Sequence, residues 1–271
     1  MTDPTSWQLS PSALPPEPRL THVEFVMGTA VTFDLRFDNE QQRETAVTAV
    51  GEACEWLHWV DTTFTTYDES SYVRRLARGE ISVDDCPPRV GEVIEMCERY
   101  RDETDGWFDP WAGPAGFDPS GLVKGWSVQL ASDLIVSSGF SRHCVNGGGD
   151  VAARGRPGDA PAWGIGIVDP FDNQSLSVAV RVVDEAVATS GVAERGRHVW
   201  RRDGTPATEL ASVTVLDPDL TRADVYATTA LAMGQEALTW LAARVSDAYV
   251  VGSDRVELMT PGFAERSERL S

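Results

Sequence analysis

Acidic side chains held at turns are the first sign of chemistry in this sequence. Residues 107–150 read WFDPWAGPAGFDPSGLVKGWSVQLASDLIVSSGFSRHCVNGGGD and contain two Phe-Asp-Pro tripeptides. Proline and glycine at this density mark turns, which hold side chains at loop tips where binding and catalysis often occur. Asp109, Asp118 and Lys124 could therefore bind a polar ligand. Each tripeptide taken alone is more often an ordinary turn opener, and only the whole run favours a functional site.

A second candidate group lies in the helical pattern near the C-terminal end. Asp224 and Thr228 are four residues apart, so they share one face of a helix. A carboxylate and a hydroxyl at that spacing can ligate one hard cation such as Mg²⁺. The alternative is a capping box, in which Thr221 begins the helix and Asp224 occupies its third position.

Two further side chains could act on a ligand. The ring of Tyr67 can stack on a flat group and its hydroxyl can form a hydrogen bond, although Asp68 or Ser70 nearby could simply cap a short helix. The imidazole of His198 has the near-neutral pKa of a general base, although a histidine without a partner is more often non-catalytic.

The glycine triplet that precedes Asp150 predicts close approach of the backbone to a ligand, because a glycine has no β-carbon. It lacks the GxGxxG spacing of a dinucleotide-binding loop.

Hydrophobic periodicity predicts the elements that position these residues. Alternation predicts a strand over 22–37, in which Met27-Gly28-Thr29 reads as a glycine bulge. It predicts further strands over 140–145, 163–167, 176–182, 211–216, 248–251 and 256–259. Three- and four-residue steps predict helices over 40–60, 72–77, 90–101, 125–138 and 221–245. With no internal repeat or linker, we expect one α+β domain of mostly antiparallel sheets with packed helices. It spans residues 21–259, between a loose N-terminal tail at 1–20 and a polar C-terminal tail at 260–271.

Composition excludes several classes of protein. A formal net charge of −19 over 271 residues argues against binding to nucleic acid or to an anionic membrane surface. An acidic protein that binds an anionic ligand needs a local cation, either a metal ion or a lysine. No stretch approaches the ~20 apolar residues of a membrane span. The N-terminus lacks a signal-peptide pattern, so we expect a cytoplasmic protein. The four cysteines form no CxxC pair and have no zinc-motif spacing, which predicts reduced thiols.

The central run resembles the FAD:protein FMN transferases, the ApbE family. The family's Gly-x-Phe-Asp-Pro with a following Gly-Pro is matched at 106–114, its Asp-…-Lys-Gly-aromatic motif at 118–126, and its Asn-x-Gly-Gly-Asp at 146–150. Similar matches extend from about residue 26 to 251. They include Met-Gly-Thr at 27–29, Ala-Thr-Ser-Gly at 188–191 and Ala-Asp-…-Ala-Thr at 223–228. After His198 the family's Asp-Pro is replaced by Arg-Arg, and Ala227 stands where some relatives carry a second Asp.

The resemblance implies an ApbE-like, T-fold-related fold and a Mg²⁺-dependent transfer of FMN from FAD to a Thr or Ser hydroxyl of an acceptor flavoprotein, with release of AMP. It implies His198 as the catalytic base. It implies FAD contacts from Met27, Tyr67, Trp107, Phe108, Asp109, Asp118, Lys124 and Val199, and metal contacts from Gly121, Asp224 and Thr228.

Two other functions stay open at this point. In an FAD diphosphatase, water would replace the acceptor and give FMN and AMP. In a flavin-binding module without turnover, the divergent region after His198 would mark lost catalysis. Free FMN formed without an acceptor would indicate the first, and FAD binding without any product would indicate the second.

Overall fold

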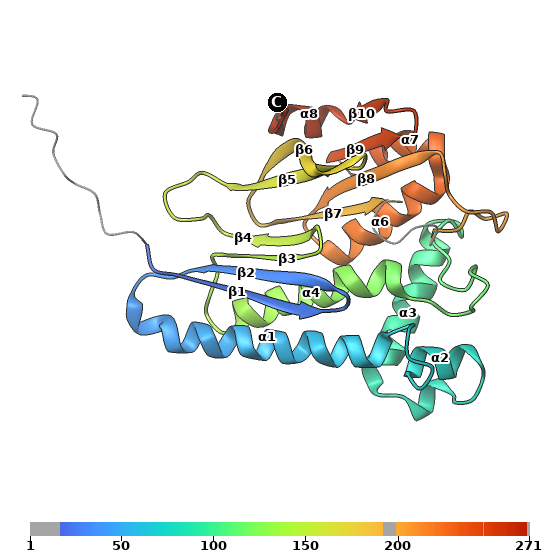
Figure 1. Ribbon diagram of the computed structural model, residues 1–271, viewed down its shortest axis with the longest axis horizontal. Helices are drawn as coiled ribbons and strands as arrows, with labels where there is room; N and C mark the ends of the chain where they lie inside the picture. The colour runs from blue at the N-terminus through green and yellow to red at the C-terminus, as the bar shows by residue number, and fades with distance from the viewer. Residues whose placement is uncertain (1–16, 192–198, 246, 270–271) are drawn as a thin grey trace, which may run out of the picture.

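A large antiparallel sheet carries helices on one face and a small sheet on the other (Figure 1). The computed structural model describes residues 17–191, 199–245 and 247–269. The large sheet has the order β1 (Arg19–Val26), β2 (Thr29–Arg36), β3 (His143–Gly147), β4 (Asp150–Arg154), β7 (Glu185–Gly191), β8 (Leu210–Asp217), β9 (Asp247–Gly252) and β10 (Glu257–Met259). The small sheet has the order β11 (Ser267–Arg269), β6 (Asp172–Val182) and β5 (Trp163–Asp169). Neighbouring strands are antiparallel in both sheets.

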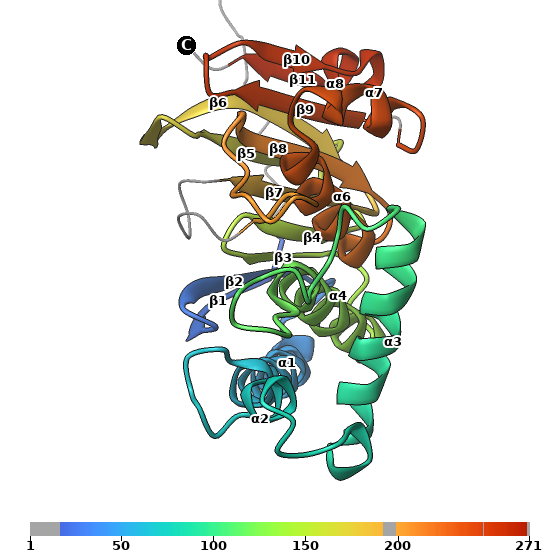
Figure 2. The same ribbon diagram turned by 90° about the vertical axis from the view of Figure 1, so that its right-hand side faces the viewer.

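Three helices cover one face of the large sheet (Figures 1 and 2). Of these, α4 (Ser120–Ser137) packs between α1 (Arg43–Phe64) and α6 (Leu220–Met233) and lies against β3 and β4. The remaining described helices are α2 (Tyr72–Ala77), α3 (Pro88–Glu103), α7 (Ala237–Ala242), α8 (Pro261–Arg266) and the 3-10 turns η1 (Glu40–Gln42), η2 (Val83–Asp85) and η3 (Gly234–Glu236). The antiparallel α+β architecture predicted from the sequence is confirmed.

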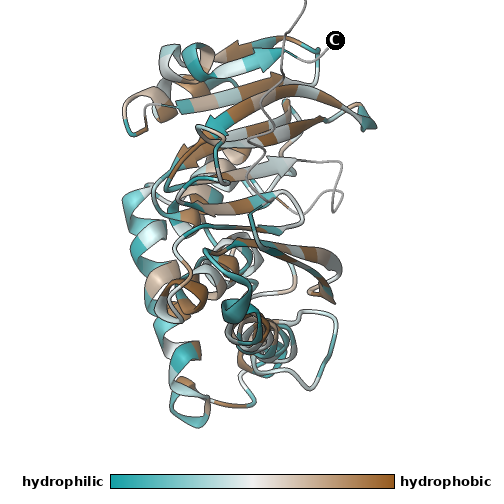
Figure 3. Cartoon of the chain, turned by 90° about the vertical axis from the view of Figure 1, so that its left-hand side faces the viewer, coloured by the Kyte–Doolittle hydropathy of each residue, from teal (hydrophilic) through white to brown (hydrophobic). Residues whose placement is uncertain are grey.

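The two faces of the large sheet have separate hydrophobic cores. Because side chains alternate across a strand, Val145 and Ala152 pack on the helical side while Val151 and Ala153 pack against the small sheet. All eight residues of β8 are buried, since both of its faces are covered. Figure 3 shows hydrophobic residues concentrated on the strands in the middle of the molecule.

The single strand predicted over 22–37 is wrong, because the chain reverses at its middle. β1 and β2 form a hairpin in which Val26 pairs with Thr29. Met27 and Gly28 both have positive φ, 54° and 71°. A two-residue turn of this hand matches the twist of the flanking strands, so the glycine closes a hairpin instead of forming a bulge.

Other boundaries also differ from the expectation. The helix predicted to reach 245 ends at Met233, because Gly234 has a φ of 73° and a short 3-10 turn separates α6 from α7. Strands β4 and β7 were not predicted. The strand expected at 140–145 begins instead at His143.

The C-terminal residues 260–271 were expected to be a polar tail, and this is wrong for the described part. They form α8 and β11, and Phe263 is fully buried against Tyr249 at 5.4 Å between ring centroids. At the other end, residues 1–16 of the predicted tail lie outside the described residues, and Arg19 already belongs to β1. Among the described helices, none has the length and hydropathy needed to cross a membrane.

The contact between α4 and α6 depends on a glycine. The Gly125 N–H donates to Asp224 Oδ2 at 2.8 Å. A β-carbon at position 125 would lie 2.7 Å from both the Asp224 β-carbon and the Leu220 carbonyl oxygen. Backbone atoms cannot rotate away, so any larger residue would push the two helices apart.

We expect Gly125→Ala to lower the free energy of unfolding by about 1–3 kcal/mol in urea denaturation, because it overpacks the helix contact. Gly51→Ala in α1 is the matched control: a β-carbon there meets no atom within 4 Å. It should stabilise the protein by up to about 1 kcal/mol through helix propensity. Equal effects of the two substitutions would contradict the close contact.

A buried histidine ties α4 to the start of β3. His143 is 0% exposed, its Nδ1 lies 2.9 Å from the Phe140 carbonyl oxygen, and its Nε2 lies 2.7 Å from Ser132 Oγ. The carbonyl can only accept, so Nδ1 carries the proton and Nε2 accepts from the serine hydroxyl. Burial lowers the pKa of His143 from 6.5 to about 4.

This pKa predicts a loss of stability in mild acid. Between pH 6.5 and about 4 the unfolded chain binds a proton at position 143 that the folded chain does not, so stability falls as pH falls, by up to about 3 kcal/mol. Urea unfolding of the wild type and of His143→Gln across this window should show a shallower pH dependence in the variant. Parallel curves would mean that His143 does not contribute.

Candidate functional site

Two adjoining cavities open where α4 meets the turns of the large sheet. Their volumes are about 330 and 580 Å³, and both are lined by Thr66, Tyr67, Ser120 and Lys124. Every predicted site residue within the described part of the chain lines one or both. Met27 lines the larger cavity, and the smaller is lined by Trp107, Phe108, Asp109, Asp118, Gly121, Val199, Asp224 and Thr228. His198 lies outside the described residues.

The two Phe-Asp-Pro segments form turns and also line the smaller cavity. Asp109 Oδ1 accepts from the Trp111 N–H at 2.9 Å, and Asp118 Oδ1 accepts from the Ser120 N–H at 3.0 Å. The Asp118 N–H donates to the Pro110 carbonyl at 2.8 Å, which closes the loop on itself. Each aspartate therefore shapes a turn and also lines the cavity.

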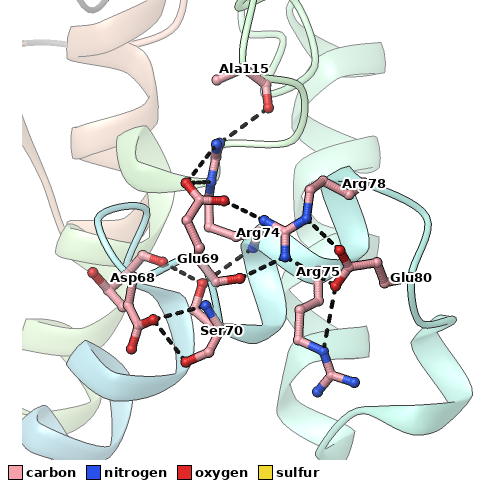
Figure 4. A network of polar contacts seen from close by, with 10 residues as sticks. Asp68, Glu69, Ser70, Arg74, Arg75, Arg78, Glu80 and Ala115 are labelled. Carbon is pink, nitrogen blue, oxygen red and sulfur yellow. Dashed lines mark hydrogen bonds and ion pairs between the residues drawn. The ribbon is translucent and has the colours of Figure 1, made fainter.

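Helix α2 braces the outer wall of this cavity. Arg74 pairs with Glu69 at 3.2 Å and donates to the Ala115 carbonyl at 3.3 Å, in the loop that lines the cavity (Figure 4). The helix is capped by Ser71, whose side chain accepts from the Arg74 N–H. The caps considered at Asp68 and Ser70 are therefore wrong.

Tyr67 lies between the two cavities with its side chain in solvent. It is 91% exposed, although it lines both cavities. An exposed aromatic ring at a cavity mouth offers a stacking surface and a hydroxyl without any need to open the core.

Two glycine turns form one wall of the larger cavity. Met27 and Gly28 belong to the β1–β2 turn, and Gly148 belongs to the β3–β4 turn. Gly148 has a φ of 65°, and a β-carbon there would lie 2.6 Å from Thr29 Oγ1, so the two turns pack closely. Met27 Sδ accepts from the Ser127 hydroxyl at 3.5 Å, which orients its thioether.

A buried ion pair places a cation at the junction of the cavities. Lys124 Nζ lies 2.9 Å from Asp150 Oδ2; the lysine side chain is 13% exposed and the aspartate 0%. Asp150 Oδ1 accepts from the Thr189 N–H at 3.2 Å, so the carboxylate joins α4, β4 and β7. In a chain of net charge −19, this lysine is a cation that lines both cavities, held in place by the carboxylate that balances its charge.

The candidate metal ligands meet where α4 crosses α6. Asp224 is 2% exposed, and Thr228 Oγ1 lies 3.0 Å from Ser190 Oγ. A β-carbon at Gly121 would lie 3.2 Å from the Thr228 methyl, so this glycine directly faces the threonine. The donor atoms available here are carboxylate, hydroxyl and carbonyl oxygens, the set that Mg²⁺ prefers.

The capping-box alternative for Asp224 is wrong. Helix α6 is capped by Asp219, whose side chain accepts from the Arg222 N–H at 3.1 Å. Asp224 instead accepts from Gly125 of α4. In a regular helix the Gly125 N–H would donate to the Gly121 carbonyl oxygen. The Asp224 carboxylate therefore competes with that carbonyl for the Gly125 N–H.

Several lining residues were not predicted as site residues. Thr189, Ser190 and Gly191 line the smaller cavity, although their Ala-Thr-Ser-Gly segment had been matched to the family. Asp150 was matched to the family motif but not predicted as a site residue; it lines neither cavity and acts on the site through Lys124. Trp200 also lines the cavity, but its surroundings lie in the stretch that departs from the family pattern, so no motif marked it.

Comparison with known proteins shows which family the chain resembles. The model of the ApbE family matches residues 27–116 and 115–250. An FAD:protein FMN transferase of Vibrio cholerae is 33% identical over 133 residues, which cover 44% of this chain and 39% of that protein. The protein of the same name from Escherichia coli K12 is 28% identical over 133 residues, covering 44% and 37%. The matched region thus spans about two fifths of the length of these relatives.

Solved structures share the fold over nearly the whole chain. The flavin transferase ApbE from Vibrio cholerae aligns with a TM-score of 0.78 at 20% identity, covering 93% of this chain and 100% of that one. The apo flavinyl transferase ApbE of Pseudomonas stutzeri aligns with a TM-score of 0.76 at 22% identity, covering 93% and 99%. With the family model matched over most of its length, the chain belongs to the ApbE family.

Proposed function

We propose that this protein transfers the FMN part of FAD to a Thr or Ser hydroxyl of an acceptor protein, with Mg²⁺ bound, and releases AMP. The observation that carries this proposal is spatial. Residues separated by up to 201 positions in the sequence, from Met27 to Thr228, line two cavities that adjoin at Lys124. Relatives that bear the name FAD:protein FMN transferase support the same chemistry.

The lining residues suit the parts of FAD. Tyr67, Trp107 and Phe108 offer aromatic faces to flat rings. Asp109 and Asp118 offer carboxylate oxygens that accept hydrogen bonds from ribose hydroxyls. Lys124 offers a cation to the pyrophosphate, at the point where the two cavities adjoin.

The reaction exchanges one phosphoester for another. The acceptor hydroxyl oxygen forms a bond to the FMN-side phosphorus, and the bond from that phosphorus to the bridging oxygen breaks, so AMP leaves with the bridging oxygen. The hydroxyl proton passes to a base, which we assign to His198 from the family resemblance. In phosphoryl transfer, positioning and electrostatic stabilisation supply most of the rate enhancement.

Gly121, Asp224 and Thr228 would hold Mg²⁺ in this proposal. A bound divalent cation neutralises charge that develops on phosphoryl oxygens. The carboxylate of Asp224 fits this role, because it lies buried beside Gly121 and Thr228 in the cavity wall and offers oxygen ligands to a hard cation. Ser190 orients the Thr228 hydroxyl from β7.

The test is transfer of FMN to a library of Thr- and Ser-containing peptides, measured by mass spectrometry as peptides that have gained FMN. We expect Mg²⁺-dependent product with the wild type and at least a hundredfold slower product with Asp224→Asn, which corresponds to about 3 kcal/mol of lost stabilisation. Asp219→Asn is the matched control: it lies on the same helix, outside the cavities, and asparagine caps helices as well as aspartate.

The same assay separates the other functions. Free FMN and AMP formed in equal amounts without any peptide would replace the transferase by a diphosphatase. If FAD binds but stays intact at every Mg²⁺ concentration, the protein is a flavin-binding module without turnover. Full activity of Asp224→Asn would remove Asp224 from the metal site.

A further inference from the structure

A second set of metal-binding side chains lies outside the FAD cavities, between the edge strand β1 and helix α1. We call His22, Glu24, Cys54 and His58 the edge cluster. None of the four lines either cavity. Strand β1 is the terminal strand of the large sheet, and α1 packs directly against it.

Regular secondary structure brings the four side chains together. His22 and Glu24 are two apart on β1, so they point to the same face of the strand. Cys54 and His58 are four apart on α1, so they share one face of the helix. Each element supplies a pair of ligands at the spacing that its geometry requires.

The donor atoms are already close to one another. One ligand atom each from His22, Glu24 and Cys54 lies within 4.8 Å of the others. Glu24 Oε2 lies 3.0 Å from His22 Nε2, and Glu24 Oε1 lies 2.8 Å from His58 Nε2. Donors around a tetrahedral Zn²⁺ stand roughly 3–4 Å apart, because each lies about 2.0–2.3 Å from the ion. His58 contacts the group through Glu24, so its imidazole must turn towards the ion for all four side chains to coordinate it.

The ligand types of the cluster also favour a transition metal. Glu24 accepts from both imidazoles, and carboxylate, imidazole and thiolate groups are the usual protein ligands of Zn²⁺.

We propose that the edge cluster binds one divalent transition-metal ion of the Zn²⁺ class, through His22 Nε2, the Glu24 carboxylate, Cys54 Sγ and His58 Nε2. On binding, the Cys54 S–H bond breaks, the sulfur forms a bond to the metal, and the proton leaves to solvent. The sulfur and imidazole donors favour Zn²⁺ or Co²⁺ over Mg²⁺, whereas the donors near Asp224 are all oxygens.

The site would join the edge of the sheet to the helix that covers it. The side chains of His22 and His58 are 41% and 52% exposed, so an ion reaches the cluster from solvent, while Cys54 at 9% exposure anchors it to the core. The sequence spacing showed no zinc motif because the four ligands come in two pairs from separate elements. The proposal does not depend on the transferase function.

Cobalt gives the most specific test, because a Co²⁺–thiolate bond produces a near-ultraviolet charge-transfer band that oxygen ligands do not. The full-length protein, reduced and stripped of metal with a chelator, is titrated with Co²⁺. We expect the band to saturate at one equivalent and to disappear when Zn²⁺ is added. Cys54→Ser should abolish it, and His58→Ala should weaken binding by roughly tenfold or more.

Cys86→Ser is the control, because Cys86 is likewise a free thiol but lies beside η2, outside the edge cluster. This variant should keep the band and the affinity of the wild type. His58 is exposed, so His58→Ala should fold normally and its thermal unfolding without metal verifies this. The absence of the band in the wild type, or its persistence in Cys54→Ser, would overturn the proposal and leave Glu24 as a carboxylate bridging two histidines.

Discussion

The contact between Asp224 and the Gly125 N–H is the constraint on which the rest of the site depends. It fixes where α4 crosses α6, and these two helices carry Gly121, Lys124 and Thr228. A buried carboxylate is unfavourable unless it is compensated, and the 2.8 Å hydrogen bond provides part of that compensation. The absence of a side chain at position 125 is what allows the approach. The helix contact and the proposed metal site therefore share one carboxylate.

The large sheet contributes the opposite wall of the site. Its hairpin turns at Met27-Gly28 and Gly148 project next to α4, while Thr189 and Ser190 of β7 approach Asp150 and Thr228. Asp150 is fully buried and pairs with Lys124, so the cation faces the cavities from a fixed position. Such preorganisation matters for phosphoryl transfer, because the protein contributes position and charge more than bonding.

Most of this arrangement could be predicted from the sequence, and the failures have physical causes. Candidate site residues could be proposed because the family motifs occur in the expected order, and each of those within the described residues lines a cavity. The hairpin at Met27 was missed because a bulge and a two-residue turn both require glycine, and only the pairing of Val26 with Thr29 distinguishes them.

Tertiary packing explains the other differences. Strands β4 and β7 are short and largely buried, so they show no alternation of polar and apolar residues. The sequence is compatible with a capping box at Thr221, but helix α6 is capped by Asp219. Asp224 instead accepts from Gly125 of α4, a helix that is distant in sequence. The edge cluster joins residues 22 and 58 through a strand and a helix, a proximity that no linear spacing encodes.

The most direct test of the account is a titration of the purified protein with FAD, followed by flavin fluorescence, with and without Mg²⁺. If the two cavities form one FAD site beside a metal, binding is saturable and tighter with Mg²⁺, and Tyr67→Ala weakens it roughly five- to tenfold while leaving thermal stability unchanged, because this side chain is 91% exposed. The account would be contradicted if binding does not saturate at tens of micromolar FAD. It would also be contradicted if neither Mg²⁺ nor the Tyr67→Ala substitution changes the affinity.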